Sequence, residues 1–225
     1  VKLYEFIKYS ENDLKFFGDS TKFLPVFKNL DNLTLNGSDR LNVVHFGGSH
    51  IQAGVWSGRI RQRMQNIQPG MKGHLGFVFP YRIAQTNSPY NYWIEYTGEW
   101  EECRNVEKDK NCDLGVSGIS VTCFDSISTF TIHKRKWIKY SDYDFNQVKI
   151  IHDFNRSYDV DLDYDDMEYE TDHDTLMGVS VFKLREYVDT LHVKITKTDS
   201  LQDHFTLHGV ILENNDPGVV YNGFG

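Results

Sequence analysis

The sequence has no long apolar stretch, since no run approaches the roughly 20 residues that a membrane-spanning helix needs. We therefore expect no membrane span. The sequence also does not start with a signal-peptide pattern. A chain trimmed after export would lack that pattern too, so its absence does not bear on localisation. Basic residues are in the minority, with 24 Lys and Arg against 32 Asp and Glu. The resulting net charge of −8 argues against a nucleic-acid or anionic-membrane partner.

Cysteine is scarce, and none of the three residues belongs to a CxxC pair or to a cysteine–histidine cluster at zinc spacing. Two interpretations stay open. Either Cys103 and Cys112 bridge a hairpin in an exported protein and leave Cys123 as a small buried hydrophobe, or all three are unpaired thiols. The phosphate-binding patterns GxGxxG and Gly-Lys-Ser/Thr are absent as well. We therefore predict no metal site and no cofactor.

Aromatic residues, in contrast, are plentiful at 14% of the chain, with 13 Tyr and 15 Phe. Such a composition favours β-rich structure and surfaces that pack against sugar rings. A length of 225 residues fits one large domain or two small ones and is enough to bury a core.

The most informative stretch runs from Leu41 to Met64 and reads LNVVHFGGSHIQAGVWSGRIRQRM. It begins with an apolar, β-branched run of strand length, continues through Gly47 and Gly48, and then reaches Ser49. Apolar residues then recur three to five positions apart, which predicts one helix to about Ile67. A serine at such a strand–turn–helix junction has an exposed oxygen and free backbone N–H groups beside it, so it can act as a nucleophile.

VVHFGGSHIQAG resembles the first sequence block of the SGNH/GDSL hydrolase superfamily, in the form found in a bacterial subgroup related to peptidoglycan and polysaccharide O-acetylesterases. The resemblance implies that Ser49 is the nucleophile and that its backbone N–H is one oxyanion donor. It also implies an α/β fold, the SGNH-type (flavodoxin-like) three-layer hydrolase. Gly48 stands where the family usually has an aspartate that orders the turn.

Residues 1–40 predict mostly helix, ending at the turn Asn36-Gly37-Ser38. After the helix predicted to end near Ile67, residues 75–79 predict a short extended segment near the rim of the site. His74 and Arg82 are polar candidates for that rim, although a solvated loop position is the commoner outcome for such residues. From Tyr92 to about Glu213 short alternating stretches without intervening helices predict an antiparallel β-sandwich. The predicted strands are 93–96, 118–124, 129–137, 148–154, 179–184, 191–196 and 205–212.

The ending ENNDPGVVYNGFG resembles the second family block, an apolar strand whose final glycine gives the second oxyanion donor, here Gly225. The resemblance thus implies three parts: 1–91 and 214–225 belong to the hydrolase domain, and 92–213 is an inserted sandwich similar to carbohydrate-binding modules. The oxyanion-hole Asn and the catalytic Asp and His of later blocks have no counterpart up to Gly225. We expect them from residues beyond it or from a second chain.

Each of these interpretations has a plain structural alternative. Ser49 could simply cap a helix. His50 follows Ser49 directly in sequence, and because neighbouring side chains diverge at such a turn we do not expect it to be the base that activates the serine. His45 is expected to be packed or hydrogen-bonded in the strand. The acidic run between Asp159 and Asp174 has partial calcium-loop spacing, but a solvated edge strand explains it better. Some aromatic residues could line a sugar-binding face, and core packing is the alternative role for each of them; they are Trp93, Trp100, Trp137 and the tyrosines.

The resemblance implies a serine esterase that removes O-acetyl groups from a cell-wall or other glycan, outside the cytoplasm. The competing hypothesis is a non-enzymatic glycan-binding or surface protein on the same scaffold. Gly48 and the missing triad partners favour the binding protein, whereas the retained Ser-His-Ile-Gln and Gly-Val-Val-Tyr segments favour the enzyme.

Overall fold

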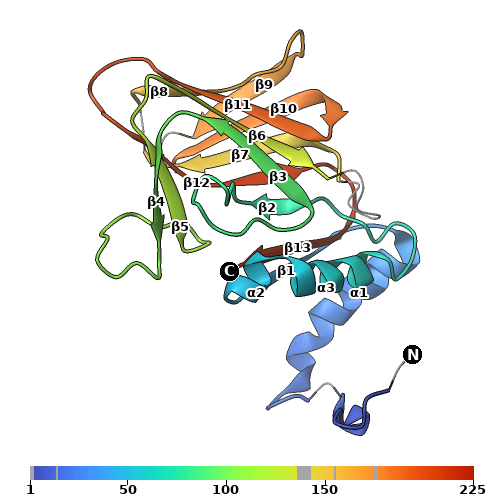
Figure 1. The fold of residues 1–225 in the computed structure, drawn as a ribbon. Helices are drawn as coiled ribbons and strands as arrows, with labels where there is room; N and C mark the ends of the chain where they lie inside the picture. The colour runs from blue at the N-terminus through green and yellow to red at the C-terminus, as the bar shows by residue number, and fades with distance from the viewer. Residues whose placement is uncertain (1–2, 14, 136–142, 155, 175–176) are drawn as a thin grey trace.

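The computed structural model describes residues 3–13, 15–135, 143–154, 156–174 and 177–225. Two antiparallel sheets form the bulk of the protein, and a smaller unit of two parallel strands and three α-helices lies beneath them in Figure 1. No helix within the described ranges combines the length and the apolar character that a membrane crossing requires.

The smaller unit is built around β1 (Arg40–Phe46) and β13 (Gly218–Phe224), which pair in parallel from Arg40↔Gly218 to Phe46↔Phe224. Helix α1 (Leu24–Asn36) packs on β1 and ends at Gly37, whose positive φ of 61° makes a left-handed cap. Helices α2 (Ser49–Gln52) and α3 (Val55–Gln65) pack on β13. Leu33, Met71 and Val219 form a small separate core here.

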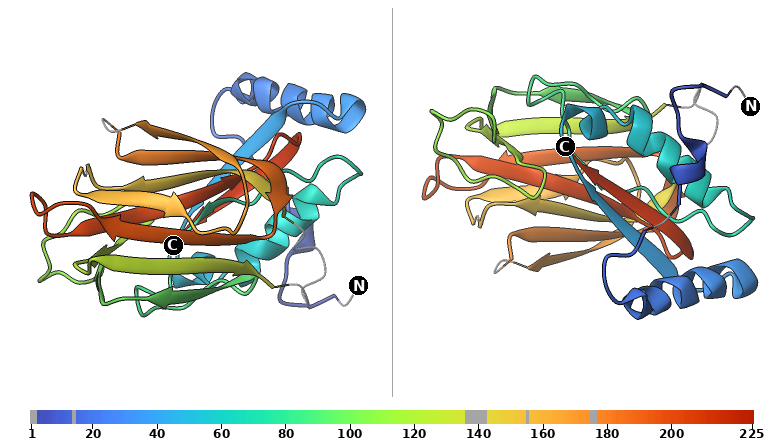
Figure 2. Two further views of the ribbon diagram at one scale, coloured as in Figure 1. Left: turned by 90° about the horizontal axis from the view of Figure 1, so that it is seen from above. Right: turned by 90° about the horizontal axis from the view of Figure 1, so that it is seen from below.

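The two larger sheets are antiparallel and face each other (Figure 2). One contains, in order, β4 (Trp100–Arg104), β5 (Ile119–Cys123), β12 (Phe205–Glu213), β7 (Phe145–His152), β10 (Val179–Val188) and β9 (Tyr169–Asp174), with β2 (Gly76–Val78) also paired to β12. The other contains β3 (Tyr92–Thr97), β6 (Ile127–Lys134), β11 (Thr190–Lys197) and β8 (Tyr158–Leu162).

Alternation of apolar and polar residues explains how these strands pack. In β6, for example, Phe130 and Ile132 are buried, and in β7 Val148 and Ile150 are buried, so alternate side chains from the two sheets meet in one continuous core. The seven strands that periodicity predicted correspond to β3, β5, β6, β7, β10, β11 and β12, although the predicted end of β6 lies outside the described residues.

The predicted fold class, an α/β three-layer hydrolase, is wrong for this chain. Strand predominates over helix, and the described residues form three sheets of which two are antiparallel. Among the described residues, parallel pairing between strands is limited to β1 and β13, and two parallel strands do not make the central layer of a three-layer domain. The predicted division at 91 and 213 remains a prediction, although β2 pairs with β12 across the first of these boundaries.

Two helix predictions need correction as well. Residues 3–13 and 15–23 contain only two short 3-10 turns, η1 (Tyr9–Glu11) and η2 (Ser20–Phe23). The helix predicted to reach Ile67 is split, because Gly54 has a positive φ of 74° and separates α2 from α3. As a result the predicted apolar stripe does not face one core: Ile51 is buried, whereas Val55 and Ile67 are exposed.

Side-chain contacts hold the parallel pair against the sandwich. The side-chain oxygen of Asn222 in β13 accepts a hydrogen bond from the backbone N–H of Phe77 in β2 at 2.7 Å. The rings of Phe77 and Phe224 lie 4.7 Å apart, and Phe224 belongs to the large core. The end of β13, where Gly225 follows, is therefore fixed in position by the sandwich.

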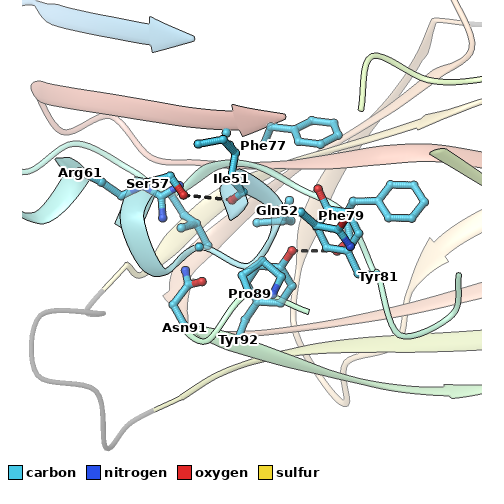
Figure 3. A pocket seen from close by; sticks show the side chains of 14 residues that line it. Ile51, Gln52, Ser57, Arg61, Phe77, Phe79, Tyr81, Pro89, Asn91 and Tyr92 are labelled. Atoms are coloured by element: carbon cyan, nitrogen blue, oxygen red, sulfur yellow. Dashed lines mark hydrogen bonds between the residues drawn. The ribbon is translucent and has the colours of Figure 1, made fainter. Parts of the chain in front are cut away.

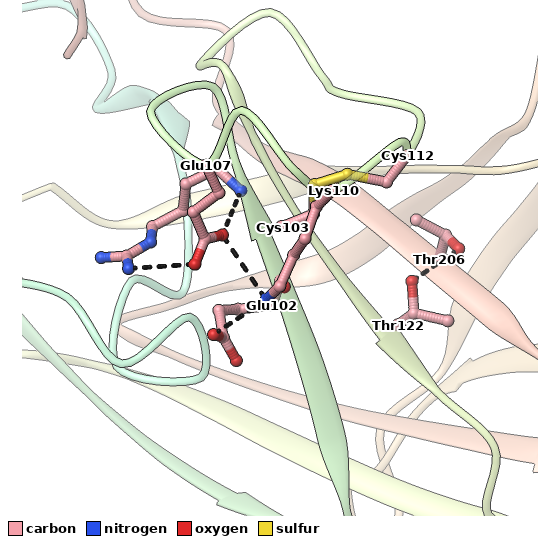
Figure 4. The surroundings of a disulfide bond; sticks show 8 residues. Glu102, Cys103, Glu107, Lys110, Cys112, Thr122 and Thr206 are labelled. Carbon is pink, nitrogen blue, oxygen red and sulfur yellow. Dashed lines mark hydrogen bonds and ion pairs between the residues drawn. A yellow bond between two sulfur atoms is a disulfide. The ribbon is translucent and has the colours of Figure 1, made fainter.

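A disulfide joins Cys103 in β4 to Cys112 in the loop that follows, as Figure 4 shows. Cys123 is buried and unpaired, and its burial raises the pKa of its thiol to about 11. Of the two interpretations left open, the structure therefore supports the bridged pair with a buried third thiol. Beside the bridge, Lys110 pairs with Glu102 and Glu107, which further orders this loop.

We predict that the double change Cys103→Ser and Cys112→Ser lowers the free energy of unfolding by about 2–3 kcal/mol, because the bond closes a loop of about ten residues and restricts the unfolded chain. Urea denaturation with and without a thiol reductant measures the effect. The reductant should destabilise the wild type to the same level and leave the double variant unchanged. Equal stability of oxidised and reduced wild type would contradict the prediction.

Candidate functional site

Ser49 lies where β1 passes through Gly47 and Gly48 into α2. The Gly47 N–H donates to the Phe224 carbonyl at 2.8 Å, and the Gly48 carbonyl accepts from the Ile51 N–H at 2.8 Å, so the turn is anchored on both sides. The Ser49 side chain is exposed, and its hydroxyl makes no hydrogen bond with any residue in the described ranges. It is thus not used as a helix cap, which removes the plain structural alternative for this serine.

Gly225 lies directly against this turn. A Cβ added to Gly225 would lie 2.5 Å from the Gly48 carbonyl oxygen and 2.6 Å from the Gln52 nitrogen, closer than real Cβ atoms approach. Only glycine fits so close to this backbone. Within the described residues, neither the Ser49 N–H nor the Gly225 N–H has a hydrogen-bond acceptor. The structure therefore brings together the two residues that the resemblance named, from sequence positions 176 residues apart.

Gln52 fixes α2 in place, a role that sequence reasoning missed. Its side chain is buried and donates to the Thr86 hydroxyl at 3.0 Å and to the Asn87 carbonyl at 2.8 Å. The Ser57 hydroxyl in α3 donates to the Ile51 carbonyl at 3.0 Å, which closes the last turn of α2, as Figure 3 shows. The one signal for this role in the sequence was the polar Gln that ends the Ser-His-Ile-Gln segment.

No histidine or carboxylate in the described part of the chain makes a hydrogen bond to Ser49. His50 is exposed, and His45 contacts the Tyr221 hydroxyl and packs against the Trp56 ring, as expected for a packed strand residue. His74 is neither at a rim nor a solvated loop residue: it is only 4% exposed, and burial lowers the pKa of its imidazole.

The remaining candidates have their partners in the sandwich. Arg82 is exposed and donates to the Ile94 carbonyl at 3.1 Å. Trp93 is half-buried and stacks on His133 with centroids 4.0 Å apart, and the Trp100 indole N–H donates to the Thr97 carbonyl. Trp137 lies outside the described residues.

The acidic run forms strands rather than a calcium loop. In β8, Asp159 and Asp161 are exposed while the alternate residues Tyr158, Val160 and Leu162 are buried. Both β8 and β9 lie at the edge of their sheets, which agrees with a solvated edge strand.

We predict that Gly48→Asp, which restores the aspartate usual in the resembled family, is tolerated. Gly48 has an extended backbone with φ −98°, and an added Cβ meets nothing within 4 Å. A carboxylate at this N-cap position can accept from the free N–H groups of α2, so the free energy of unfolding should rise by a few tenths of a kcal/mol. Urea denaturation measures the change.

The matched control is Gly47→Asp. Its Cβ would lie 2.3 Å from the Ile51 Cγ1 atom, so we expect a loss of about 1–3 kcal/mol. A loss of that size in Gly48→Asp itself would show that the turn does not have the space described.

Comparisons with known proteins support a fold relationship only. No protein-family model and no curated protein sequence matches the chain. A solved structure of a peptidoglycan O-acetylesterase is similar to it, with a TM-score of 0.54 and 14% sequence identity. The match covers 88% of this chain and 50% of that one, so this chain spans about half the length of the protein it resembles. At this level of identity the likeness shows the fold alone. It suggests a relationship with an esterase.

Proposed function

We propose that this chain carries the nucleophile of a serine esterase of the SGNH type, which removes O-acetyl groups from a glycan. The observation that carries the proposal is the junction itself: an exposed, unbonded Ser49 hydroxyl at the carboxyl end of β1, with Gly225 packed against the same turn. Ligands of parallel sheets bind at the carboxyl ends of the strands. The fold likeness to a peptidoglycan O-acetylesterase agrees with this reaction class.

In the proposed reaction, the Ser49 oxygen attacks the carbonyl carbon of an acetyl ester, and the sugar hydroxyl leaves with a proton. Water then hydrolyses the acetyl-serine, releasing acetate and restoring the hydroxyl. The unbonded N–H groups of Ser49 and Gly225 would receive the negative charge on the carbonyl oxygen in both steps. The histidine that removes the serine proton would come from residues beyond Gly225 or from a second chain.

The disulfide favours a location outside the cytoplasm, because such bonds form and persist in oxidising compartments. A cell-wall glycan is a substrate found there, so we propose a periplasmic or extracellular enzyme.

The second candidate is a glycan-binding or surface protein without catalysis. The absence of a base beside Ser49 in the described residues favours it. A serine-directed fluorophosphonate separates the two in the full-length protein, because only an activated serine reacts with it. We expect one label, found on the peptide that contains Ser49 by mass spectrometry, and none after heat denaturation. An unlabelled native protein would support the binding function.

A further inference from the structure

A buried serine links three neighbouring strands of the larger sheet. Ser180 in β10 is only 3% exposed and lies on the same inward face as Phe182. Its hydroxyl oxygen lies 3.0 Å from Nε2 of His152 in β7 and 3.0 Å from Nδ1 of His173 in β9. Because β10 lies between β7 and β9, these contacts attach the edge strand β9 to the interior of the sheet through side chains.

The positions of the protons follow from the acceptors. Nδ1 of His152 lies 2.7 Å from the Asp153 carbonyl oxygen, which can only accept, so this nitrogen carries the hydrogen. In the neutral ring Nε2 is then an acceptor, and the Ser180 hydroxyl donates to it. Since its one hydrogen is used, the hydroxyl accepts from the Nδ1–H group of His173. We call these three side chains, His173, Ser180 and His152, the histidine–serine bridge.

Protonation of His152 disrupts the histidine–serine bridge. Nε2 would then carry a hydrogen and donate to the Ser180 oxygen, which already accepts from His173. The hydroxyl hydrogen would lose its acceptor, because Ser180 makes no other side-chain hydrogen bond within the described residues. A buried hydroxyl without an acceptor is costly. The His152 ring also packs against buried Phe205, with centroids 5.2 Å apart, so its positive charge would be poorly hydrated.

The groups around His152 determine the direction in which acid acts. Burial lowers the pKa of His152, the Asp153 carboxylate and carbonyl raise it, and His173 in β9 and His208 in β12 lower it further. The net pKa lies below the ordinary value of about 6.5. An opened state with a solvated His152 therefore binds the proton more tightly than the closed state. The stability that the neutral ring contributes is complete above about pH 6.5 and is lost as the pH falls below it.

The other end of β9 is held by a hydroxyl that does not titrate in this range. The Tyr169 oxygen lies 2.6 Å from a carboxylate oxygen of Asp161 and 3.1 Å from the Leu162 carbonyl oxygen, both in β8. Burial and the hydrogen bond to Asp161 raise the pKa of Tyr169 to about 12, so the hydroxyl stays protonated. Acid thus weakens the side-chain attachment at only one end of the strand.

We propose that the histidine–serine bridge is a pH-sensitive switch in the sandwich. At neutral pH it fixes the His173 end of β9 to β10. At mildly acidic pH, protonation of His152 releases that end while Tyr169 keeps the other end attached. The release exposes backbone N–H and C=O groups of β10 that β9 covers in the closed state. The switch lies outside the turn that carries Ser49 and does not depend on the proposed esterase.

Amide hydrogen exchange followed by NMR at pH 7 and pH 5, corrected for the intrinsic pH dependence of exchange, tests the proposal. We expect the amides that pair residues 171–173 with 180–182 to lose protection about tenfold or more at pH 5. The buried Val148 and Ile150 in β7 should keep their protection. His152→Gln cannot be protonated but can still accept from the Ser180 hydroxyl, so it should keep β9 protected at pH 5.

Two further variants complete the test. Ser180→Ala removes the bridge, so it should lower β9 protection at pH 7 to the level of the wild type at pH 5, and it keeps the test open if His152→Gln does not fold. Tyr169→Phe is the matched control, because it removes the other attachment and should leave the acid effect at the His173 end unchanged. Full β9 protection in the wild type at pH 5, an equal loss in His152→Gln, or an equal loss at Val148 and Ile150 would overturn the proposal.

Discussion

Ser49→Ala in the full-length protein should lower the hydrolysis of p-nitrophenyl acetate by at least about a thousandfold, because removing the nucleophile of a serine hydrolase leaves only binding and oxyanion stabilisation. The Tm should stay within about 1 °C of the wild type, since surface changes away from bonded features have small effects. The Ser49 side chain is exposed and has no hydrogen bond within the described residues, so folding does not use it.

Ser126→Ala is the matched control, because Ser126 is also exposed and lies between β5 and β6, far along the chain from the turn. It should leave both turnover and Tm unchanged. Undiminished turnover in Ser49→Ala would remove this serine from the mechanism, and a large fall in Tm would show that its hydroxyl has a structural role instead.

The second large effect is expected from Gly225→Ala. The new methyl group would meet the Gly48 carbonyl oxygen and the Gln52 nitrogen at 2.5 and 2.6 Å, and neither backbone atom can move without shifting the turn. We expect kcat/KM to fall about a hundredfold or more, the loss typical of one misplaced oxyanion donor. The free energy of unfolding should fall by about 1–3 kcal/mol, as for other overpacked sites.

Gly48→Ala adds a methyl group of the same size where nothing lies within 4 Å. It should cost little in stability or turnover. Steady-state kinetics and urea denaturation of the two alanine variants therefore compare one methyl group in two positions of the same turn. Full activity in Gly225→Ala would exclude Gly225 from the oxyanion site.

Local features of this fold were predictable from sequence because short-range chemistry determines them. The strand before Gly47 and the helix stop at Gly37 follow from apolar runs and glycine. The acidic run was interpreted as a solvated edge strand, and the structure has two strands there, β8 and β9, each at the edge of its sheet. The alternation of Tyr158, Val160 and Leu162 with aspartates explains why one face of β8 is buried.

Long-range pairing was not predictable in the same way. The twelve residues around Ser49 resemble an α/β hydrolase, and extending that likeness to the whole chain gave the wrong fold class, because those residues specify one turn and not the pairing of distant strands. The closeness of Ser49 and Gly225 came from the resemblance, whereas their catalytic roles stay predictions. The contact of Gln52 with Thr86 and Asn87 was missed for the same reason, because it joins two segments that are far apart in the sequence.

The pairing of β1 with β13 has a consequence for biosynthesis. About 180 residues separate Arg40 from its partner Gly218, so the first strand leaves the ribosome long before the last one exists. At typical translation speeds the wait is roughly ten to thirty seconds. During that time the backbone N–H and C=O groups along this edge of β1 lack the strand that later pairs with them. The nascent polypeptide should therefore need a chaperone, and its folding should be slow because so much chain must be ordered before the two ends meet.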